Sequence, residues 1–308
     1  MSFEGSINIL DEENMYWLKL LGFLIGIIVL GITCYIDDSK GIPSWVKLIA
    51  QVVAAVVVAV CGIKIENINL PFIDNKIFFY EWFSYIITIG WIVGITNAIN
   101  LIDGLDGLSS GITLISCFSL LIIFLLTPSS PLISILLITA LAGSIVGFLP
   151  FNFSPAKTFI GDVGSNFLGF SLAVISILGV AKTYTALVLI APIIVLALPI
   201  FDTIFAIIRR IIKGKSIKAV FKADKGHLHH RLMKRGYTQK QAVLILYGLT
   251  ATFGMFAIIL LESGIWKALS FALLVIAIIA IGYKDIFKVK QEDDDINIID
   301  EKHIRTDK

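Results

Sequence analysis

The chain has 308 residues, of which 57% are hydrophobic and only 16% charged, and its mean hydropathy is +0.91. Soluble domains have about a quarter of their residues charged, so this composition excludes an ordinary soluble protein. It predicts an all-α, polytopic integral membrane protein whose core is formed by helices packed in lipid. The formal net charge is +2 at pH 7, but the charges are unevenly distributed.

Nine apolar runs are long enough to cross a membrane, since a spanning helix needs about 20 residues. Several contain Gly, Ser or Thr, which allow close helix packing. Pro192 and Pro199 are expected to kink the seventh run. In chain order the runs are 15–36, 44–63, 82–101, 107–126, 131–150, 165–181, 184–208, 241–261 and 264–283.

The connection from 209 to 240 sets the expected orientation. It is rich in Lys and Arg and holds a single acid, Asp224. By the positive-inside rule it is cytoplasmic, which places the N-terminus outside and the C-terminus inside. We therefore expect a membrane-embedded domain over 1–283 and a cytoplasmic, partly disordered tail over 284–308.

Four polar motifs fall at the predicted cytoplasmic helix ends. Unrelated structural carboxylates would be scattered over both faces, so their convergence predicts an active site near the inner membrane surface. The motifs are IDDSKG (36–41), NLIDGLDG (100–107), FIGDVGS (159–165) and DKGHLHHRL (224–232).

The chemistry of these motifs favours phosphoryl transfer. Carboxylates without Cys ligands suit a hard cation such as Mg²⁺ or Mn²⁺, and a basic loop with histidines suits a diphosphate. Positioning and charge neutralisation then perform most of the catalysis. The residues concerned are Asp37, Asp38, Asp103, Asp106, Asp162, His227, His229 and His230.

Each motif also has a simpler interpretation. Asp162 could cap the next helix, and Asp37 with Asp38 could form a solvated turn. The histidines could bind zinc, but their spacing fits no usual finger. The basic loop could serve only as a topological signal and a lipid-headgroup contact.

Asp103 and Asp106 are the hardest to explain structurally. With Asn100 they step by three, so on a helix they would share one polar face. Two unpaired aspartates at membrane depth would cost roughly 5–7 kcal/mol on insertion scales. An ionisable residue inside a membrane indicates function by default.

These motifs resemble those of the polyprenyl-phosphate N-acetylhexosamine-1-phosphate transferases. That family includes bacterial enzymes that start teichoic acid, O-antigen and arabinogalactan linkage units, and the translocase of peptidoglycan synthesis. The resemblance covers most of residues 30–240, and HLHHRL is similar to the teichoic-acid and O-antigen branch, which uses UDP-N-acetylglucosamine. The matching stretches are IDDSKGIPSWVKLIAQ, WIVGITNAINLIDGLDGLSSG, FNFSPAKTFIGDVGSNFLG, PIFDTIFAIIRR and DKGHLHHRLMKRG.

The resemblance implies a role for each motif residue except Asp202, for which none follows. It makes Asp162 the ligand of Mg²⁺, for which Mn²⁺ could substitute, and Asp37 and Asp38 the pair that binds or deprotonates the lipid phosphate. Asp103 and Asp106 belong with Asn100 to the uridine and diphosphate region. The remaining substrate-binding residues implied are Asn152, Phe159, Ser165, His227, His229, His230 and Arg231.

The implied reaction joins a UDP-N-acetylhexosamine to undecaprenyl phosphate and releases UMP, at the cytoplasmic face of a bacterial-type plasma membrane. The lipid bilayer is a partner, nucleic acid is not, and a homodimer is an alternative to a monomer. The chain begins where the third span of the family would, so domain 1–283 is expected to lack the first two helices. Two rival hypotheses are a non-catalytic shortened paralogue and a cation-coupled secondary transporter, although transporter sites usually lie at the bilayer midplane.

Overall fold

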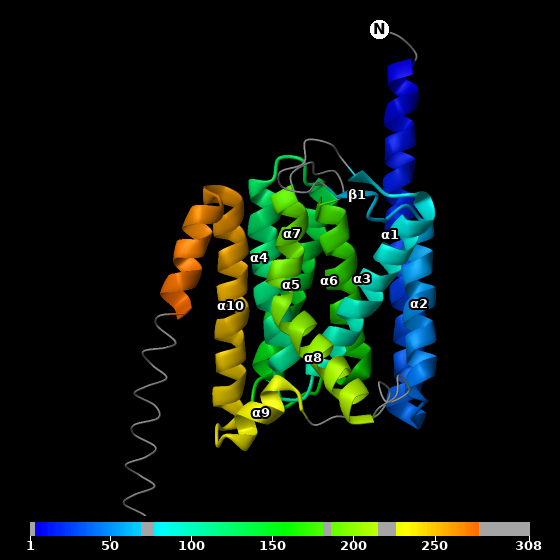
Figure 1. The fold of residues 1–308 in the computed structure, drawn as a ribbon. Helices are drawn as coiled ribbons and strands as arrows, with labels where there is room; N and C mark the ends of the chain where they lie inside the picture. The colour runs from blue at the N-terminus through cyan, green and yellow to red at the C-terminus, as the bar shows by residue number, and fades with distance from the viewer. Residues whose placement is uncertain (1–3, 69–76, 181–185, 215–225, 277–308) are drawn as a thin grey trace, which may run out of the picture. The chain divides into compact units, whose positions relative to one another are not determined.

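The computed structural model describes residues 4–68, 77–180, 186–214 and 226–276 (Figure 1). The chain divides into two compact units, Met1–Leu261 and Glu262–Lys308. The tail predicted for 284–308 lies outside the described residues. The elements are α1 (Glu4–Lys40), α2 (Ser44–Val60), β1 (Asn67–Ile68), β2 (Ile77–Phe78), α3 (Glu81–Ile102), α4 (Leu108–Leu126), α5 (Leu132–Asn152), α6 (Gly161–Val180), α7 (Ala186–Val195), α8 (Ala197–Gly214), α9 (Leu228–Lys234) and α10 (Gln239–Ser263).

Within the described residues, all regular structure is helical apart from the two-residue antiparallel pairing of β1 with β2. Six described helices are long and apolar enough to cross a membrane, namely α1 from Tyr16 onward, α3, α4, α5, α6 and α10. Helix α2 and a further helix, Ile265–Ile276, are apolar but shorter. The predicted class of polytopic membrane protein is therefore confirmed, whereas the nine spans and the orientation stay predictions.

The seventh predicted span differs from the structure. A single kinked helix over 184–208 was expected, but α7 ends at Val195 and α8 begins at Ala197. Pro192 lies inside α7, and Pro199 lies in the first turn of α8, where its missing N–H costs no hydrogen bond. The expected kink is therefore found as an interruption at Leu196, between the two prolines.

Helix α6 lies at the centre of the first unit and packs against α1, α3, α4 and α5. Its residues from Leu168 to Val180 are buried on every face, as expected of a helix that is apolar all round. Gly169 lets α3 approach closely, because a Cβ at this position would lie 2.8 Å from the Cα of Thr96.

The polar motifs gather at one end of this unit. Helices α1, α3, α5 and α8 end there, whereas α2, α4, α6 and α10 begin there, and α9 lies at the same end (Figure 1). The predicted convergence of the four motifs is therefore confirmed for their described residues. Residues 215–225, including Asp224, lie outside the description.

Candidate active site

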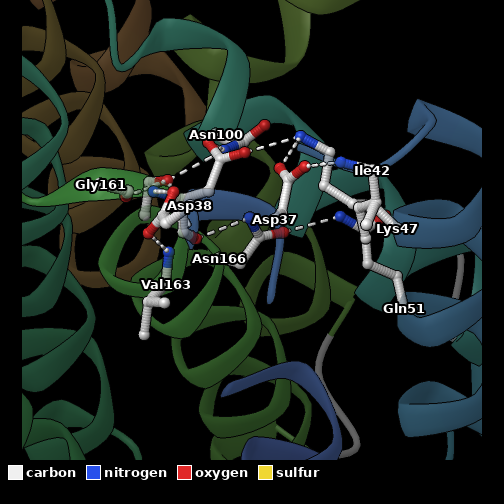
Figure 2. A network of polar contacts seen from close by, with 11 residues as sticks. Asp37, Asp38, Ile42, Lys47, Gln51, Asn100, Gly161, Val163 and Asn166 are labelled. Carbon is white, nitrogen blue, oxygen red and sulfur yellow. Dashed lines mark hydrogen bonds and ion pairs between the residues drawn. The ribbon is translucent and has the colours of Figure 1, made fainter. Parts of the chain in front are cut away.

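The centre of the candidate site is Lys47, near the start of α2. Its Nζ lies 2.7 Å from Oδ2 of Asp37 and 2.6 Å from Oδ2 of Asp162. The other Asp162 oxygen accepts a hydrogen bond from Nδ2 of Asn100 at 2.9 Å. Four helices thus contribute to one cluster, in which two carboxylates share a single ammonium group (Figure 2).

Asp38 occupies a different place from its neighbour. Its two carboxylate oxygens accept the backbone N–H groups of Asp162 at 3.1 Å and Val163 at 3.3 Å (Figure 2). Asp38 on α1 therefore caps the first turn of α6, where a negative charge interacts favourably with the helix dipole. A Cβ at Gly161, which has a φ of +64°, would lie 2.9 Å from this carboxylate.

These contacts correct two simpler interpretations. Asp37 and Asp38 do not form a solvated turn, because α1 continues to Lys40 and both carboxylates bind other parts of the chain. Asp37 also accepts the backbone N–H of Ile42 at 2.7 Å. Asp162 is not merely a helix cap, because its carboxylate binds Lys47 and Asn100 from neighbouring helices.

A chain of amides, two buried and one half-buried, lies beside the cluster. Asn97 donates to Oε1 of Gln51, whose Nε2 donates to Oδ1 of Asn166 at 2.7 Å. Asn166 in turn donates to the backbone carbonyl of Asp162 at 2.8 Å. Because buried amides are costly unless bonded, this chain ties α2 and α3 to the first turn of α6.

The motif 100–107 does not form the shared helical face that we expected. Helix α3 ends at Ile102, so Asp103 and Asp106 lie in the turn before α4. Asp103 accepts a hydrogen bond from Oγ of Ser109 at 2.6 Å, whereas Asp106 accepts the N–H of Ala156 at 3.2 Å. Because the chain leaves the helix at this turn, the spacing of three residues does not place the two carboxylates on one helical face. The two carboxylates have separate partners.

Burial raises the pKa of Asp103 from its usual 3.8 to about 6, and the negative charge of Asp162 adds to the rise. The hydroxyl of Ser109 acts in the opposite direction, because it donates to the charged carboxylate. Asp103 is thus a carboxyl group that changes charge close to neutral pH.

The three histidines lie on or just before α9. His227 and His229 stack with their ring centres 5.9 Å apart, and His229 lies 4.2 Å from His230. Neither ring nitrogen of His229 has a hydrogen-bond partner within the described part of the chain. A Cβ at Gly104 would lie 2.3 Å from its Nε2, so this ring packs directly on the 103–107 turn.

His229 is held in its neutral form. Burial, together with the neighbouring His230 and His227, lowers its pKa to about 4. An uncharged imidazole can accept a hydrogen bond through one nitrogen and donate one through the other. His229 can therefore offer one donor and one acceptor without carrying a charge.

Asn152 is the last residue of α5, and Phe159 lies in the connection from α5 to α6. Asn152 is buried, accepts a hydrogen bond from Ser110 at 2.8 Å and donates to the carbonyl of Thr158 at 3.0 Å. Phe159 is 76% exposed. Asn152 thus fixes the connection that carries Phe159, and the phenyl ring is available at the surface.

Ser165 and Arg231 complete the predicted set. Ser165 is buried and its Oγ accepts a hydrogen bond from Asn100 at 2.9 Å, so it belongs to the Lys47 cluster. Arg231 is exposed on α9. The structure therefore brings Ser165 together with the carboxylates and leaves Arg231 at the surface beside the histidines.

The described residues contain no group of three or more His, Cys, Asp or Glu side chains that could hold a metal ion. Mg²⁺, however, is usually held by one or two carboxylates together with substrate phosphates. Asp37 and Asp162 form such a pair, and they already share one cation, the ammonium group of Lys47. The residues present fit a metal site that the substrate completes.

A cavity of about 830 Å³ opens beside the cluster, between α2, α3 and α8. Lys47, Asn100 and Arg210 line the end near the polar motifs, where α2 begins and α3 ends. Farther along these helices the walls are apolar. They include Leu48, Val52, Ile86, Ile89 and Val93.

Lys47 and the amide chain beside it, Gln51, Asn97 and Asn166, were not among the residues singled out from the sequence. Lys47 could have been found, because it is the only charged residue in the apolar run 44–63. A charged side chain inside such a run indicates a functional partner. The amides give no comparable signal, since their bonding appears only when the helices are packed.

Comparison with known proteins identifies the family of this chain. Residues 20–180 match the family described as glycosyl transferase family 4. The chain belongs to this family, as its resemblance predicted.

Three relatives illustrate the match. A protein of Bacillus subtilis (strain 168) named "Probable undecaprenyl-phosphate N-acetylglucosaminyl 1-phosphate transferase" is 42% identical, over 85% of this chain and 70% of its own length. A "Decaprenyl-phosphate N-acetylglucosaminephosphotransferase" of Mycobacterium leprae is 34% identical, over 72% and 59%. A "Phospho-N-acetylmuramoyl-pentapeptide-transferase" of Limosilactobacillus reuteri is 39% identical, over 52% and 51%. The chain therefore spans between about half and 70% of these relatives.

Proposed function

We propose that the protein transfers N-acetylglucosamine-1-phosphate from UDP-N-acetylglucosamine to undecaprenyl phosphate. UMP is released, and the lipid-linked sugar starts a cell-envelope glycan. The names of the Bacillus and Mycobacterium relatives support the sugar and the polyprenyl-phosphate acceptor. The same proposal places nine spans in a bacterial plasma membrane, with the site at the cytoplasmic face.

The observation that carries this proposal is the cavity beside Lys47. Its apolar walls suit a polyprenyl chain, and its polar end suits the phosphate at the head of that chain. Ligand sites are commonly apolar hollows with a few polar groups that fix orientation. In the proposed complex, the lipid phosphate lies next to Lys47 and Asn100.

The nucleotide sugar is assigned to the other side of the cluster. There the 103–107 turn packs on His229, and the α5–α6 connection presents Phe159. In the proposed complex, the histidines contact the diphosphate, whereas Asp103, Asp106 and the aromatic ring form the uridine side. Both substrates then meet at Asp37 and Asp162.

In the proposed step, an oxygen of the lipid phosphate attacks the β-phosphorus of the UDP-sugar. A new P–O bond forms, and the bond from the β-phosphorus to the bridging oxygen breaks. UMP leaves with that oxygen and its electron pair. A proton still held by the lipid phosphate passes to Asp37, whose carboxylate contacts Lys47. Asp38 holds the first turn of α6 and thereby positions Asp162.

We assign the Mg²⁺ site to Asp162, with Asp37 as its neighbouring carboxylate. A bound divalent cation supplies charge stabilisation for the diphosphate as the P–O bond breaks. Asn100 and Asn166 hold Asp162 in place through its carboxylate and its backbone carbonyl. Mn²⁺ can replace Mg²⁺ in this assignment, since both prefer oxygen ligands.

The test is a reconstitution of the full chain in vesicles with undecaprenyl phosphate, Mg²⁺ and a panel of labelled UDP-sugars. We expect equal amounts of UMP and lipid-linked sugar phosphate, with UDP-N-acetylglucosamine as the best donor. The product should disappear in excess chelator and return in part with Mn²⁺. Sugar uptake without UMP release would indicate a transporter instead, and binding of both substrates without product would indicate a non-catalytic paralogue.

A further inference from the structure

Asp202 is the only acidic residue of α8, and both of its carboxylate oxygens bind the start of α9. Oδ2 lies 2.8 Å from Nδ1 of His227, and Oδ1 accepts the backbone N–H of Leu228 at 2.9 Å. Asp202 and His227 are 5% and 4% exposed. A carboxylate so deeply buried needs a bonded partner, and here the partner is the histidine motif.

Asp202 holds both the imidazole ring of His227 and the backbone at the start of α9. His227 is the residue before α9, and its own side chain makes no capping hydrogen bond. Asp202 supplies the missing acceptor from another helix, at the end where negative charge is favourable. With Nδ1 engaged by the carboxylate, Nε2 is the ring nitrogen left for a substrate, as in other carboxylate–histidine pairs.

The pair also connects the two sides of the candidate site. His227 stacks on His229, which packs on the turn at Gly104. On the other side, α8 contributes Thr203 and Arg210 to the wall of the cavity. Asp202 therefore links the helix beside the acceptor cavity to the helix that carries the histidines.

We infer that Asp202 is a positioning residue for the donor substrate, which acts by holding His227 with Nε2 free to meet the diphosphate. This inference rests on the proposed function. A role limited to packing would change the amount and thermal stability of the protein alone. A positioning role also changes the kinetics for the UDP-sugar, and it does so only while His227 is present.

The test compares Asp202→Asn, His227→Gln and the double variant in the reconstituted full chain. An asparagine presents one acceptor oxygen where the carboxylate presents two. We expect Asp202→Asn to lower kcat/KM for the UDP-sugar by about 10- to 100-fold, the usual effect of removing a group that orients a functional histidine. The KM for undecaprenyl phosphate should stay within about twofold. In the His227→Gln background the same change should add less than about twofold, because coupled residues are not additive.

Glu66→Gln is the matched control, since it replaces an exposed carboxylate by an amide at the opposite end of α2 and α3. It should change neither kinetics nor stability. Independent, multiplicative effects of the Asp202 and His227 variants would overturn the inference. So would a loss of folded Asp202→Asn protein with unchanged kinetics in the remainder.

A second measurement does not depend on turnover. In ¹⁵N spectra of the histidine-labelled full chain at pH 8.5, His227 should carry its proton on Nδ1, because Asp202 accepts there. In Asp202→Ala, which offers no acceptor, the proton should shift to Nε2. An unchanged tautomer would refute the holding role even if the kinetics had changed. If the wild-type protein releases no UMP, the proposed function fails, and the spectra still decide whether Asp202 orients His227.

Discussion

Lys47 is the residue around which the carboxylates are arranged. Its ammonium group satisfies Asp37 and Asp162 at once, which offsets the cost of placing two negative charges beside lipid. The same position is where a divalent cation would neutralise them. In the proposed complex, lysine and metal contribute to one local charge balance, and a prediction follows for each side of it.

The first prediction concerns Asp162. Asp162→Asn removes a charged ligand but keeps the shape, and Asp38 still caps α6 through the backbone. Charge stabilisation by a metal is worth several kcal/mol, so the rate should fall by roughly two to three orders of magnitude at about 1.4 kcal/mol for each. Membrane protein level and rate are measured together. Near-normal turnover would show that Asp162 does not hold the metal.

The second prediction concerns Lys47. Lys47→Met leaves Asp37 and Asp162 without their shared cation, so Mn²⁺ should bind more tightly, by about tenfold or more. Transfer should nevertheless fall, because the lipid phosphate loses its cationic partner. Mn²⁺ titration followed by electron paramagnetic resonance measures the affinity. Lys64→Met is the control, since Lys64 also pairs with acids, Glu66 and Glu81, but at the other helix ends.

The third prediction concerns the pKa of Asp103, which burial raises to about 6. Because the folded-state pKa exceeds the usual 3.8, Asp103 favours folding when protonated, and this stabilisation is lost as pH rises through about 6. Asp103→Asn should therefore raise Tm at pH 8 and leave it unchanged near pH 4. An equal change in Tm at both values would contradict the shift.

The rate should show the opposite dependence on pH. If the charged form of Asp103 serves the donor side, kcat/KM for the UDP-sugar falls as pH drops through about 6, because this ratio reports groups of the free enzyme. Asp103→Asn should remove that inflection and leave a lower rate. An inflection that persists in the variant belongs to another group.

At the scale of elements, α6 determines where the site forms. Its first turn carries Asp162, it is capped by Asp38 from α1, and its buried length packs chiefly against α1, α3, α4 and α5. Helix α9 is capped in the same way, by Asp202 from α8. In both cases the cap comes from another helix, so the first turn is fixed only when the helices are packed together.

The fourth prediction tests the contact of α6 with α3. Gly169→Ala places a Cβ 2.8 Å from the Cα of Thr96, and overpacking of this kind typically costs about 1–3 kcal/mol. We expect a lower Tm and a lower rate, because Asn100 on α3 would shift relative to Asp162. Gly143→Ala on α5 is the control, since nothing lies within 4 Å of its Cβ. Equal effects of the two variants would count against a special contact.

At the scale of the whole molecule, the motifs lie at one end of the first unit, and the fifth prediction tests which membrane face this is. In a Cys61→Ser background, Ser129→Cys should react with an impermeant thiol reagent from outside intact cells. Lys234→Cys, at the last residue of α9, should react only after the membrane is opened. The remaining cysteines, Cys34 and Cys117, are buried. The reverse labelling pattern would place the site outside the cell.

Much of the architecture could be predicted from the sequence. The apolar runs correspond to helices, and the motifs at 36–41, 100–107 and 159–165 lie at one end, because hydrophobicity and length are local properties of a segment. The family could also be predicted, since its motifs are contiguous stretches. The exception was the turn at Asp103, where local backbone geometry overrides the periodic pattern.

Tertiary structure alone decided the partners of each carboxylate. Lys47 and Asp162 are separated by 115 positions, and Asp202 reaches His227 across 25. Nothing in the spacing of Asp37 and Asp38 indicates that one binds Lys47 while the other caps α6. Successive residues of a helix point about 100° apart, so the direction of each side chain depends on how its helix is rotated. Only the packed helices therefore determine which polar groups meet.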